Sequence, residues 1–484
     1  MINNSHYKRQ LPFVILVVLL LVIFLLDRSV QYGLFLDGLI YASIARNMAE
    51  GMGSFWVPYY AGPDMFFSHP PLMFGLQAVF FKIFGSFYGT EKIYNFVIWL
   101  ITVFLIRGCW RTIDVSDRFK ATWWVPLLFW GFMPSVLWAY PNNILDSTMA
   151  MFDLAAIVVL LKGKQNNGLL HVVIAALLLF CASFTKGLSG LFPLIVPAVY
   201  SIVYNDGKLA RAIFNSLLMA GIVAAIYLVL WQFPQPQHYL NIYYHWQIVG
   251  SLRGMSDNTA SEFGRFDIVL MILTEVAIMV GVCVLVYVLS RLLKTGKALL
   301  TDRKKHVLFF LLIGLSASLP LMVSYKVRSF YLVPALPYFA IAGGVLMYPF
   351  LIQPTERYTL GTRYMKGLNV LFGVAGIVAL ALMYGKAGTI GRDHEIIEDV
   401  NTISQHVPAT ESVIAAPGID KNYEFMAYMQ RHKKIDLYYP LELNSAQYII
   451  ADGQNRSNCY LWRADLNGYR QMPTNTKRFV VYKK

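Results

Sequence analysis

Long apolar runs alternate with short polar segments along most of this chain. The runs are roughly 16–24 residues long, the length that an α-helix needs to cross a hydrocarbon core about 30 Å thick. We therefore expect eleven membrane-spanning helices, at residues 11–27, 92–108, 121–140, 148–162, 169–184, 188–204, 212–233, 266–290, 307–323, 330–350 and 368–385. The first run follows Lys8 and Arg9, as a signal peptide would, but no small-residue cleavage site follows it. It is therefore interpreted as a retained anchor.

Basic residues mark one side of the predicted membrane protein. Lys and Arg are frequent at the N-terminus and in the loops 109–120, 163–168, 205–211, 291–306 and 351–367, and they are scarcer in the loops of the other side. Short cytoplasmic loops carry an excess of Lys and Arg, so the basic side is predicted to be cytoplasmic. Eleven spans then place the C-terminus outside, which corresponds to the periplasmic side of a bacterial inner membrane.

The first outer loop, residues 28–91, is half-apolar and is predicted to lie on the membrane surface. Apolar residues recur at helical spacing between Leu39 and Met48, which favours a short interfacial helix. Pro70 and Pro71 then fix an extended turn. The segment from Leu72 to Phe84 is interpreted as a second interfacial helix.

The pattern changes after residue 385, where the long apolar runs stop. Three short strands are expected at 412–416, 434–439 and 446–452, and two helices at 393–405 and 422–431. Alternating strands and helices predict a small α/β domain on the outer face. The chain thus divides into a transmembrane domain, residues 1–385, and an extracytoplasmic domain, residues 386–484.

Composition agrees with a polytopic membrane protein. Hydrophobic residues make up 57% of the chain and charged residues 14%, with a mean hydropathy of +0.51, whereas soluble proteins carry about 25% charged residues. The net charge of +14 does not indicate nucleic-acid binding, because most of the basic residues lie in short loops between spans. The four cysteines show no metal-ligand spacing and no disulfide framework.

Ionisable residues at the outer ends of the spans are candidates for function, because such groups are costly there unless they pair or act. They are Asp37 and His69 in the first loop, Asp146 in PNNILDS, Lys186 in FTKG, and Lys326 and Arg328 in SYKVRS. Cations suit a phosphate, which Arg can bind in a bidentate manner. A carboxylate near an acceptor hydroxyl suits general-base catalysis. Together they indicate an enzyme that uses a lipid-linked phosphoryl donor.

Each of these residues also has a simpler interpretation. Asp37 and Asp146 could cap the helices that follow them, and Lys186 could extend to the interface without a partner. The basic pair of SYKVRS could anchor to anionic lipid head groups, and His69 could be an ordinary interfacial residue. A transporter or flippase of lipid-linked sugars is the alternative function, although no internal repeat is visible and the ionisable residues lie at one edge instead of the midplane.

Four segments resemble a known family in the right order. They are DGLIYASIARNM with FSHPPLMFGLQAVFFKIFG, NNILDSTMAMF, FTKGLSGLFPLIVPA and SYKVRSFYLVPALPYFAIAGG. This set resembles the GT-C glycosyltransferases of family 39, which include protein O-mannosyltransferases and lipid A aminoarabinose transferases. The resemblance covers nearly the whole chain and implies a GT-C fold of about 11–13 transmembrane helices with a small outer C-terminal domain.

The resemblance implies an inverting glycosyltransferase that moves a sugar from a polyprenyl-phosphate donor, undecaprenyl phosphate in bacteria, to a lipid, glycan or protein acceptor. It makes Asp37 the main catalytic carboxylate and Asp146 the second acidic residue. It assigns the donor phosphate to Lys326 and Arg328, with Lys186 adding to their field. The residues expected to contact substrate are Tyr41, Arg46, His69, Tyr325 and Tyr331, although Tyr325 and Tyr331 also fit an aromatic belt.

The chain departs from this family at two positions. Many relatives carry an acidic residue after the first Asp, where this chain has Gly38. The aminoarabinose transferases carry Lys before the Pro-Pro pair, where this chain has His69, as in many less specialised bacterial members, and this departure argues against the aminoarabinose–lipid A assignment. No cofactor or metal is expected to be required. A divalent ion held by Asp37, Asp146 and His69 is the alternative, although their sequence spacing gives no signal for it.

Overall fold

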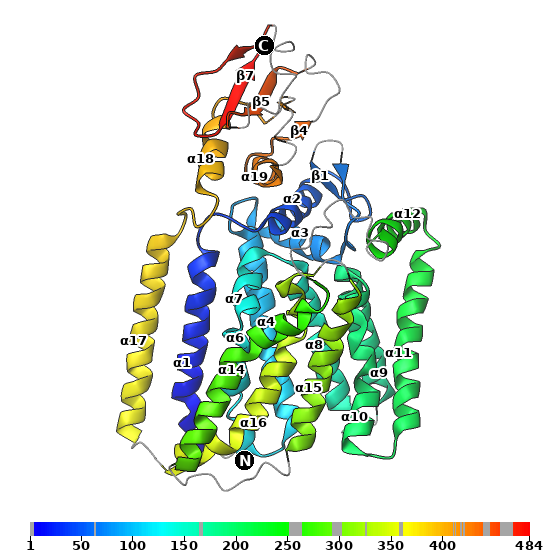
Figure 1. Ribbon diagram of the computed structural model, residues 1–484, viewed down its shortest axis with the longest axis vertical. Coiled ribbons are helices and arrows are strands. Elements are labelled where there is room, and N and C mark those ends of the chain that lie inside the picture. The colour runs from blue at the N-terminus through cyan, green and yellow to red at the C-terminus, as the bar shows by residue number, and fades with distance from the viewer. Residues whose placement is uncertain are drawn as a thin grey trace.

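The computed structural model describes residues 4–484 apart from 62–63, 164–167, 251–263, 293–302, 325–326, 358–361, 410, 412, 417–418, 420–421, 439–445 and 455–467. Helices run side by side in a bundle, and the C-terminal domain sits on one end of it (Figure 1). We call this the domain end of the bundle. The N-terminus lies at the other end, which we call the opposite end.

Seven of the described helices are long and apolar enough to cross a membrane, or eight if one bent pair counts as a single span. The helices of the bundle, with their bounds, are α1 (Asn4–Ser29), α4 (Thr90–Ile113), α6 (Trp124–Gly131), α7 (Pro134–Ala139), α8 (Leu145–Gly163), α9 (Leu169–Lys186), α10 (Val196–Tyr204), α11 (Leu209–Leu230), α14 (Asp267–Leu292), α15 (Lys304–Ser318), α16 (Leu336–Arg357) and α17 (Thr362–Lys386). Each predicted span overlaps one or two of these helices.

Four of the predicted spans are not continuous α-helices, and the one at 307–323 ends in a short 3-10 helix after α15. The span predicted at 121–140 is broken into α6 and α7, because Pro134 begins a new helix at its first position. The segment Pro134–Asn142 meets Leu145–Gly163 at 112°. The span predicted at 188–204 starts as a 3-10 helix, η2 (Leu188–Ile195), before α10, and the span predicted at 330–350 starts as η5 (Ser329–Leu332) before α16. The remaining short turns are α5 (Asp117–Lys120), η1 (Tyr140–Asn142), η3 (Tyr244–Val249) and η4 (Leu319–Val323).

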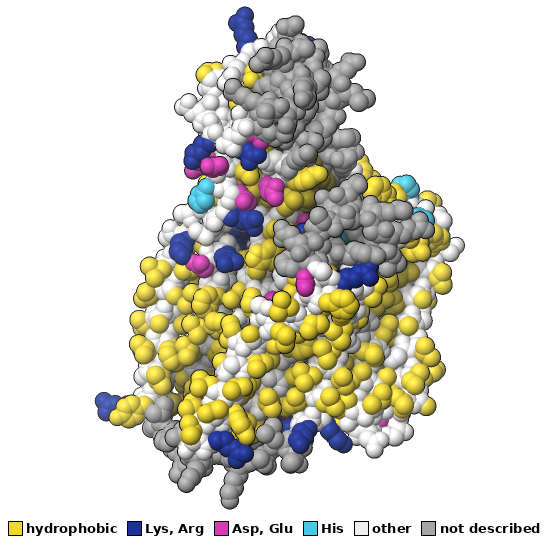
Figure 2. Space-filling model, in the orientation of Figure 1, with side chains coloured by type: hydrophobic (Ala, Val, Ile, Leu, Met, Phe, Trp, Pro, Cys, Tyr) yellow, Lys and Arg dark blue, Asp and Glu magenta, His cyan; other side chains and the backbone are white. Residues whose placement is uncertain are grey.

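The surface of the bundle carries a broad apolar band. On the face shown in Figure 2, hydrophobic side chains cover the bundle, while Lys and Arg gather at the opposite end and charged residues of both signs lie at the domain end. A band of this kind bounded by charge is what a bilayer requires of a protein that crosses it. The chain is therefore a multi-pass membrane protein.

The first loop packs between the bundle and the C-terminal domain. It contains α2 (Leu36–Glu50), the hairpin of β1 (Tyr59–Ala61) and β2 (Asp64–Met65), and α3 (Leu72–Phe84), and α12 (Pro234–Tyr243) lies beside it (Figure 1). Both predicted helices are confirmed. One side of α2 places Leu39 in the core of the C-terminal domain, and the other places Tyr41 and Ile44 in the core of the bundle. Thus α2 is largely buried and does not lie on an open membrane surface.

In its described residues, the C-terminal domain is a five-stranded mixed sheet with two helices. Its elements are α18 (His394–Ile403), β3 (Val413–Ala415), α19 (Tyr423–Lys433), β4 (Leu437–Tyr438), β5 (Tyr448–Asp452), β6 (Arg470–Gln471) and β7 (Phe479–Lys483). The strand order is β4-β3-β5-β7-β6, with β3 parallel to β4 and β5, and β7 antiparallel to β5 and β6. The three predicted strands and two predicted helices are confirmed, whereas β6 and β7 were not predicted.

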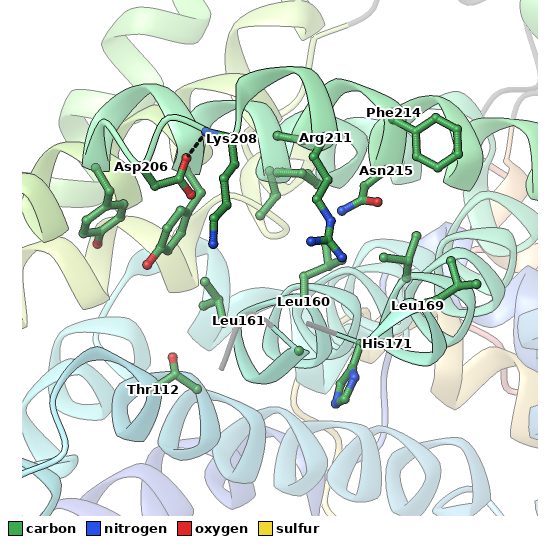
Figure 3. A pocket seen from close by; sticks show the side chains of 18 residues that line it. Thr112, Leu160, Leu161, Leu169, His171, Asp206, Lys208, Arg211, Phe214 and Asn215 are labelled. Atoms are coloured by element: carbon green, nitrogen blue, oxygen red, sulfur yellow. Dashed lines mark hydrogen bonds between the residues drawn. The ribbon is translucent and has the colours of Figure 1, made fainter. Parts of the chain in front are cut away.

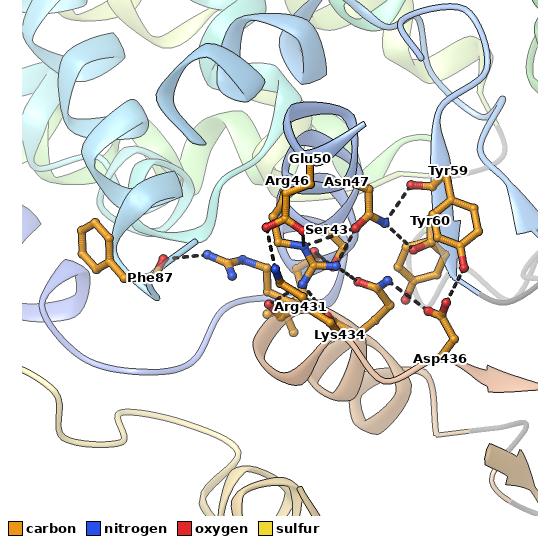
Figure 4. A network of polar contacts seen from close by, with 12 residues as sticks. Ser43, Arg46, Asn47, Glu50, Tyr59, Tyr60, Phe87, Arg431, Lys434 and Asp436 are labelled. Atoms are coloured by element: carbon orange, nitrogen blue, oxygen red, sulfur yellow. Dashed lines mark hydrogen bonds and ion pairs between the residues drawn. The ribbon is translucent and has the colours of Figure 1, made fainter. Parts of the chain in front are cut away.

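A buried polar network joins α2 to α19, and we call it the domain clamp (Figure 4). Arg46 donates from Nη1 to the Gln430 and Arg431 carbonyls at 2.7 and 3.0 Å, and from Nη2 to the Gln430 side chain at 2.5 Å. Arg431 forms a buried ion pair with Glu91 of α4 at 2.5 Å. Asn47 adds hydrogen bonds to the backbone of the β1 hairpin. The clamp fixes the angle at which α2 crosses the end of the bundle.

Burial and the nearby Arg431 lower the pKa of Arg46 to about 10, so Arg46 is still charged at neutral pH. The acceptors around it compensate the cost of burying that charge.

Candidate active site

Asp37 lies in the first turn of α2. The N-cap of this helix is Phe35, which has extended backbone angles and no side-chain cap. The interpretation of Asp37 as the N-cap is therefore wrong, and its carboxylate belongs to the helix proper. A negative charge in the first turn is favoured by the helix dipole, and Asp37 is only partly buried. The Asp37 carboxylate is thus positioned by α2, and the residue is partly exposed.

Two asparagines between η1 and α8 hold the start of α2. The Asn142 side chain accepts the Phe35 backbone N–H at 2.9 Å, and the Asn143 side chain donates to the Gly38 carbonyl at 2.8 Å. Asn143 has φ +58°, a left-handed conformation that Asn tolerates better than most residues. Since α8 begins at Leu145, these bonds also hold the helix that carries Asp146 against the helix that carries Asp37.

Gly38 permits this close approach. A Cβ atom at Gly38 would lie 2.0 Å from the Asn142 carbonyl oxygen, which is far inside contact distance. The side-chain oxygen of Asn143 also accepts hydrogen bonds from Gln77 of α3 at 2.6 Å and from Asn95 of α4 at 2.8 Å. An acidic side chain at this position would not fit here without a shift of the backbone.

Asp146 and Lys186 form an ion pair at the domain end. Asp146 is in the first turn of α8, Lys186 is the last residue of α9, and Lys186 Nζ donates to Asp146 Oδ1. Their side chains are 3% and 13% exposed, so this is a nearly buried pair. Because it pairs with Asp146, Lys186 does not simply extend to the interface. The Lys186 ammonium also lies 4.0 Å from the ring centroid of Tyr331, which is a cation–π distance.

Tyr41 and Tyr331 lie within the electrostatic reach of both carboxylates. Burial raises the pKa of the Tyr41 phenol, and the negative charges of Asp37 and Asp146 raise it further. Tyr331, which precedes α16, lies within electrostatic reach of Asp146, Asp37 and Arg328 as well as of Tyr41. Residues from α2, α8 and the segment before α16 therefore converge, and the Tyr41 phenol stays a protonated donor.

Helix α12 forms hydrogen bonds to His69 and to the end of α9. The His69 ring lies 5.9 Å from the Tyr41 ring in an edge-on arrangement. Tyr239 of α12 donates a hydrogen bond to the His69 carbonyl, and Tyr243 donates to the Lys186 carbonyl at 3.4 Å. The two tyrosines were not singled out from the sequence, although their spacing of four residues places them on one helix face.

Gly187 ends α9 with φ +102°, and a Cβ there would lie 2.0 Å from Tyr243 Oη. The glycine after Lys186 is therefore required both by the backbone conformation and by the approach of α12.

The structure brings together most of the predicted site residues. We call the following set the carboxylate cluster: Asp37, Tyr41, His69, Asp146, Lys186, Arg328 and Tyr331. Arg46 is not part of it, because its side chain is fully buried in the domain clamp; the prediction that Arg46 contacts substrate is not supported by this placement. Tyr325 and Lys326 lie outside the described residues.

The alternative of a divalent ion requires several metal-ligating side chains to lie close together. Among the described residues, no group of three or more His, Cys, Asp or Glu side chains has an arrangement that could hold a metal ion. The prediction that no metal is required stays a prediction.

The fold and the cluster at its domain end define a polytopic membrane protein with the GT-C fold, as predicted. The chain is similar over its whole length to the solved structure of ArnT from Cupriavidus metallidurans bound to undecaprenyl phosphate. The TM-score is 0.64 and the identity 16%, and the match covers 97% of each chain. The structure of the same ArnT in the apo state gives a TM-score of 0.62 at 15% identity, covering 96% of this chain and 97% of that one.

No protein-family profile and no curated protein sequence matches the chain. At such low identity the structural likeness defines the fold, and the reaction has to be inferred from the residues of this chain.

Proposed function

We propose that this protein is an inverting glycosyltransferase that uses a polyprenyl-phosphate sugar, most simply an undecaprenyl-phosphate sugar, as its donor. The acceptor is a lipid, glycan or protein. The observation that carries the proposal is the convergence of Asp37 with the Asp146–Lys186 pair and Tyr331 at one end of a membrane bundle. The likeness to a protein crystallised with undecaprenyl phosphate supports the choice of lipid carrier.

In this proposal Lys186 and Arg328 bind the donor phosphate. Lys186 is paired with Asp146. A phosphate placed beside the ammonium would share it with the carboxylate, and the partly exposed Arg328 would supply a second set of donors. Negative charge grows on the phosphate as the sugar leaves, so these cations stabilise the transition state more than the ground state.

Asp37 is proposed to act on the acceptor. The acceptor hydroxyl oxygen forms a bond to the anomeric carbon on the face opposite the phosphate. The bond between that carbon and the phosphate oxygen breaks, and its electron pair leaves with polyprenyl phosphate. The hydroxyl proton goes to the Asp37 carboxylate, whose residue is partly exposed. One displacement of this kind inverts the anomeric configuration.

The cluster is proposed to work on the outer face of a bacterial inner membrane. Figure 2 shows Lys and Arg at the opposite end of the bundle, which is the distribution expected of a cytoplasmic side. The donor's lipid would then lie in the outer leaflet, beside the apolar band, with its phosphate at the level of Lys186. A reporter fused after Lys484 should give an extracytoplasmic signal.

The test uses the purified full-length chain with a panel of undecaprenyl-phosphate sugars and mixed membrane-lipid, glycan and peptide acceptors. Mass spectrometry should detect free undecaprenyl phosphate and one acceptor whose mass increases by one sugar residue. Transport alone would leave the bond between sugar and phosphate intact. A protein that is folded in detergent but releases no undecaprenyl phosphate from any donor of the panel would contradict the proposal.

A further inference from the structure

A cavity of about 630 Å³ opens at the opposite end of the bundle, far from the carboxylate cluster. It lies between the last turn of α8, the first turns of α9 and α11, and α10. Helix α8 separates it from Asp146 by most of its length, because Leu160, the α8 lining residue nearest to Asp146, is about 21 Å away at 1.5 Å per residue. The cavity is therefore a separate site, and what it binds does not depend on the proposed glycosyltransferase reaction.

Two cationic side chains point into this cavity (Figure 3). Lys208 and Arg211 are three residues apart at the start of α11, and both reach towards the end of α8. In the part of the chain that the structure describes, neither side chain forms a salt bridge. The nearby Asp206 carboxylate accepts hydrogen bonds from Ser201 Oγ at 2.5 Å and from the Lys208 backbone N–H at 3.0 Å. The cavity thus presents two cations to a ligand.

The other walls of the cavity are of two kinds. Leucines of α8 and α9, with Val172, Val196 and Pro197, form apolar walls. Polar groups lie beside the cations, and they include the Asn215 amide and the phenols of Tyr200 and Tyr204. Helices α9 and α11 both begin here, so the positive ends of their dipoles add to the field of Lys208 and Arg211. This arrangement suits a ligand with an anionic head and an apolar body.

Lipid-facing side chains continue from the cavity along the bundle. Leu169 is 61% exposed and Phe214 is 61% exposed, and both line the cavity at its margin. Further exposed apolar residues follow on the same two helices, such as Leu217 of α11. A molecule whose phosphate sits between Lys208 and Arg211 would therefore find a continuous apolar surface for acyl chains.

We propose that this cavity binds the phosphate head group of an anionic glycerophospholipid, with Lys208 and Arg211 as its phosphate ligands. The basic end of the bundle faces the leaflet in which anionic lipids are attracted to Lys and Arg. A phosphate contacted by Arg and Lys forms charge-assisted hydrogen bonds, which are stronger than neutral ones. The bound lipid would join the ends of α8, α9 and α11, and α8 and α9 are the helices that carry Asp146 and Lys186 at the domain end.

Native mass spectrometry of the full-length protein in a mild detergent tests the site. Phosphatidylglycerol is the probe, and phosphatidylcholine with the same acyl chains is the reference lipid. The double variant Lys208→Gln/Arg211→Gln should weaken phosphatidylglycerol binding about tenfold or more, because two charge-assisted contacts are lost. Phosphatidylcholine binding should change little.

Arg363→Gln/Lys366→Gln is the matched control. These two residues are also three apart, exposed and in the first turns of a helix that begins at the opposite end, and they do not line the cavity. This control should bind phosphatidylglycerol like the unmodified protein. Equal losses in the two double variants would mean general attraction to a basic surface and would overturn the proposal.

Two further measurements use the unmodified chain, so a folding defect of a variant cannot obscure the result. A photoreactive phosphatidylglycerol should crosslink to peptides of α8, α9 or α11 that line the cavity, and crosslinks confined to other segments would overturn the proposal. Inorganic phosphate at millimolar concentration should not displace the lipid. Complete displacement would assign the cavity to free phosphate instead of a phospholipid.

Discussion

The two ends of α2 carry polar clusters of different character. The domain clamp near its C-terminus surrounds Arg46 with backbone and side-chain acceptors, so that all of the guanidinium nitrogens have a partner. The carboxylate cluster near its N-terminus has partly exposed groups, and a single lysine is paired with Asp146. A buried network around a charged group stabilises one arrangement of the chain, whereas partly exposed side chains are accessible to a substrate. Helix α2 therefore contributes both to the packing of the C-terminal domain and to the proposed active site.

The largest expected effect is on catalysis in the carboxylate cluster. Asp37→Asn removes the proposed base with little change in shape, so turnover should fall by about 10²- to 10⁴-fold, while the unfolding temperature stays the same. The rate of undecaprenyl phosphate release measures this. Asp27→Asn is the matched control, because Asp27 lies at the same end in an exposed pair with Lys386. Near-normal turnover of Asp37→Asn would remove Asp37 from the mechanism.

A substitution in the domain clamp should lower the stability of the protein and leave the turnover of the folded molecules unchanged. Arg431→Met leaves Glu91 buried without its partner, in a pair whose side chains are 1% and 0% exposed. Breaking such a pair costs about 3–5 kcal/mol, so thermal unfolding in detergent should begin at a clearly lower temperature. Lys434→Met breaks the exposed pair with Glu50 and should cost about 0–1 kcal/mol. The contrast between the regions would fail if Arg431→Met lowered turnover per folded molecule as much as Asp37→Asn.

Replacing Lys186 should lower both donor affinity and stability, each by less than the variants above. Lys186→Met removes a proposed phosphate ligand and leaves Asp146 unpaired, so donor affinity should fall about tenfold and stability should decrease. Adding Asp146→Asn removes the unpaired charge, so the double variant should regain stability without regaining donor binding. Lys386→Met, in an exposed pair, is the control. Recovery of donor binding in the double variant would mean that Lys186 serves only to neutralise Asp146.

The smallest expected effect is a dependence of stability on pH at the clamp. Burial, followed by the charges of Arg431, Lys433, Lys92 and Arg46, holds the pKa of His432 well below its usual 6.5. Below pH 6.5 the His432 imidazole becomes protonated in the unfolded chain but stays neutral in the folded chain. Stability should therefore decrease as the pH falls below 6.5, by at most about 1.4 kcal/mol per pH unit from this group.

His432→Gln should reduce that slope in unfolding experiments between pH 6.5 and 5. His394→Gln is the control, since His394 also lies in the C-terminal domain, in the exposed first turn of α18. An unchanged slope in His432→Gln would show that other groups set the acid sensitivity.

Local patterns in the sequence predicted much of the fold. The helix expected from Leu72 to Phe84 has those bounds, because its apolar run lies between Pro71 and Gly85. Gly51 ends α2 in a left-handed conformation, as expected of a C-terminal glycine. The strand β7 was missed, although Phe479 and Val481 alternate as a half-buried strand does.

Contacts between distant segments could not be predicted in the same way. Asp37, Asp146 and Lys186 were placed at one end because spans alternate in direction, and the resemblance to a known family gave their roles. The sequence gives no sign that Arg46 contacts Gln430, because the two residues are 384 positions apart and no periodicity links them. For that reason the sequence alone predicts that Arg46 contacts substrate. The bonds of Asn143 to α2, α3 and α4 were also invisible in the sequence, since each depends on tertiary packing.

The location of the carrier phosphate distinguishes the two regions most directly. A cryo-electron microscopy map of the purified protein with undecaprenyl phosphate would show it. We expect the phosphate within about 4 Å of the Lys186 ammonium, as in an ion pair, with Arg328 on its other side and the lipid chain beside the apolar band. A phosphate bound at the domain clamp, or only between Lys208 and Arg211, would contradict the assignment of the carboxylate cluster as the active site.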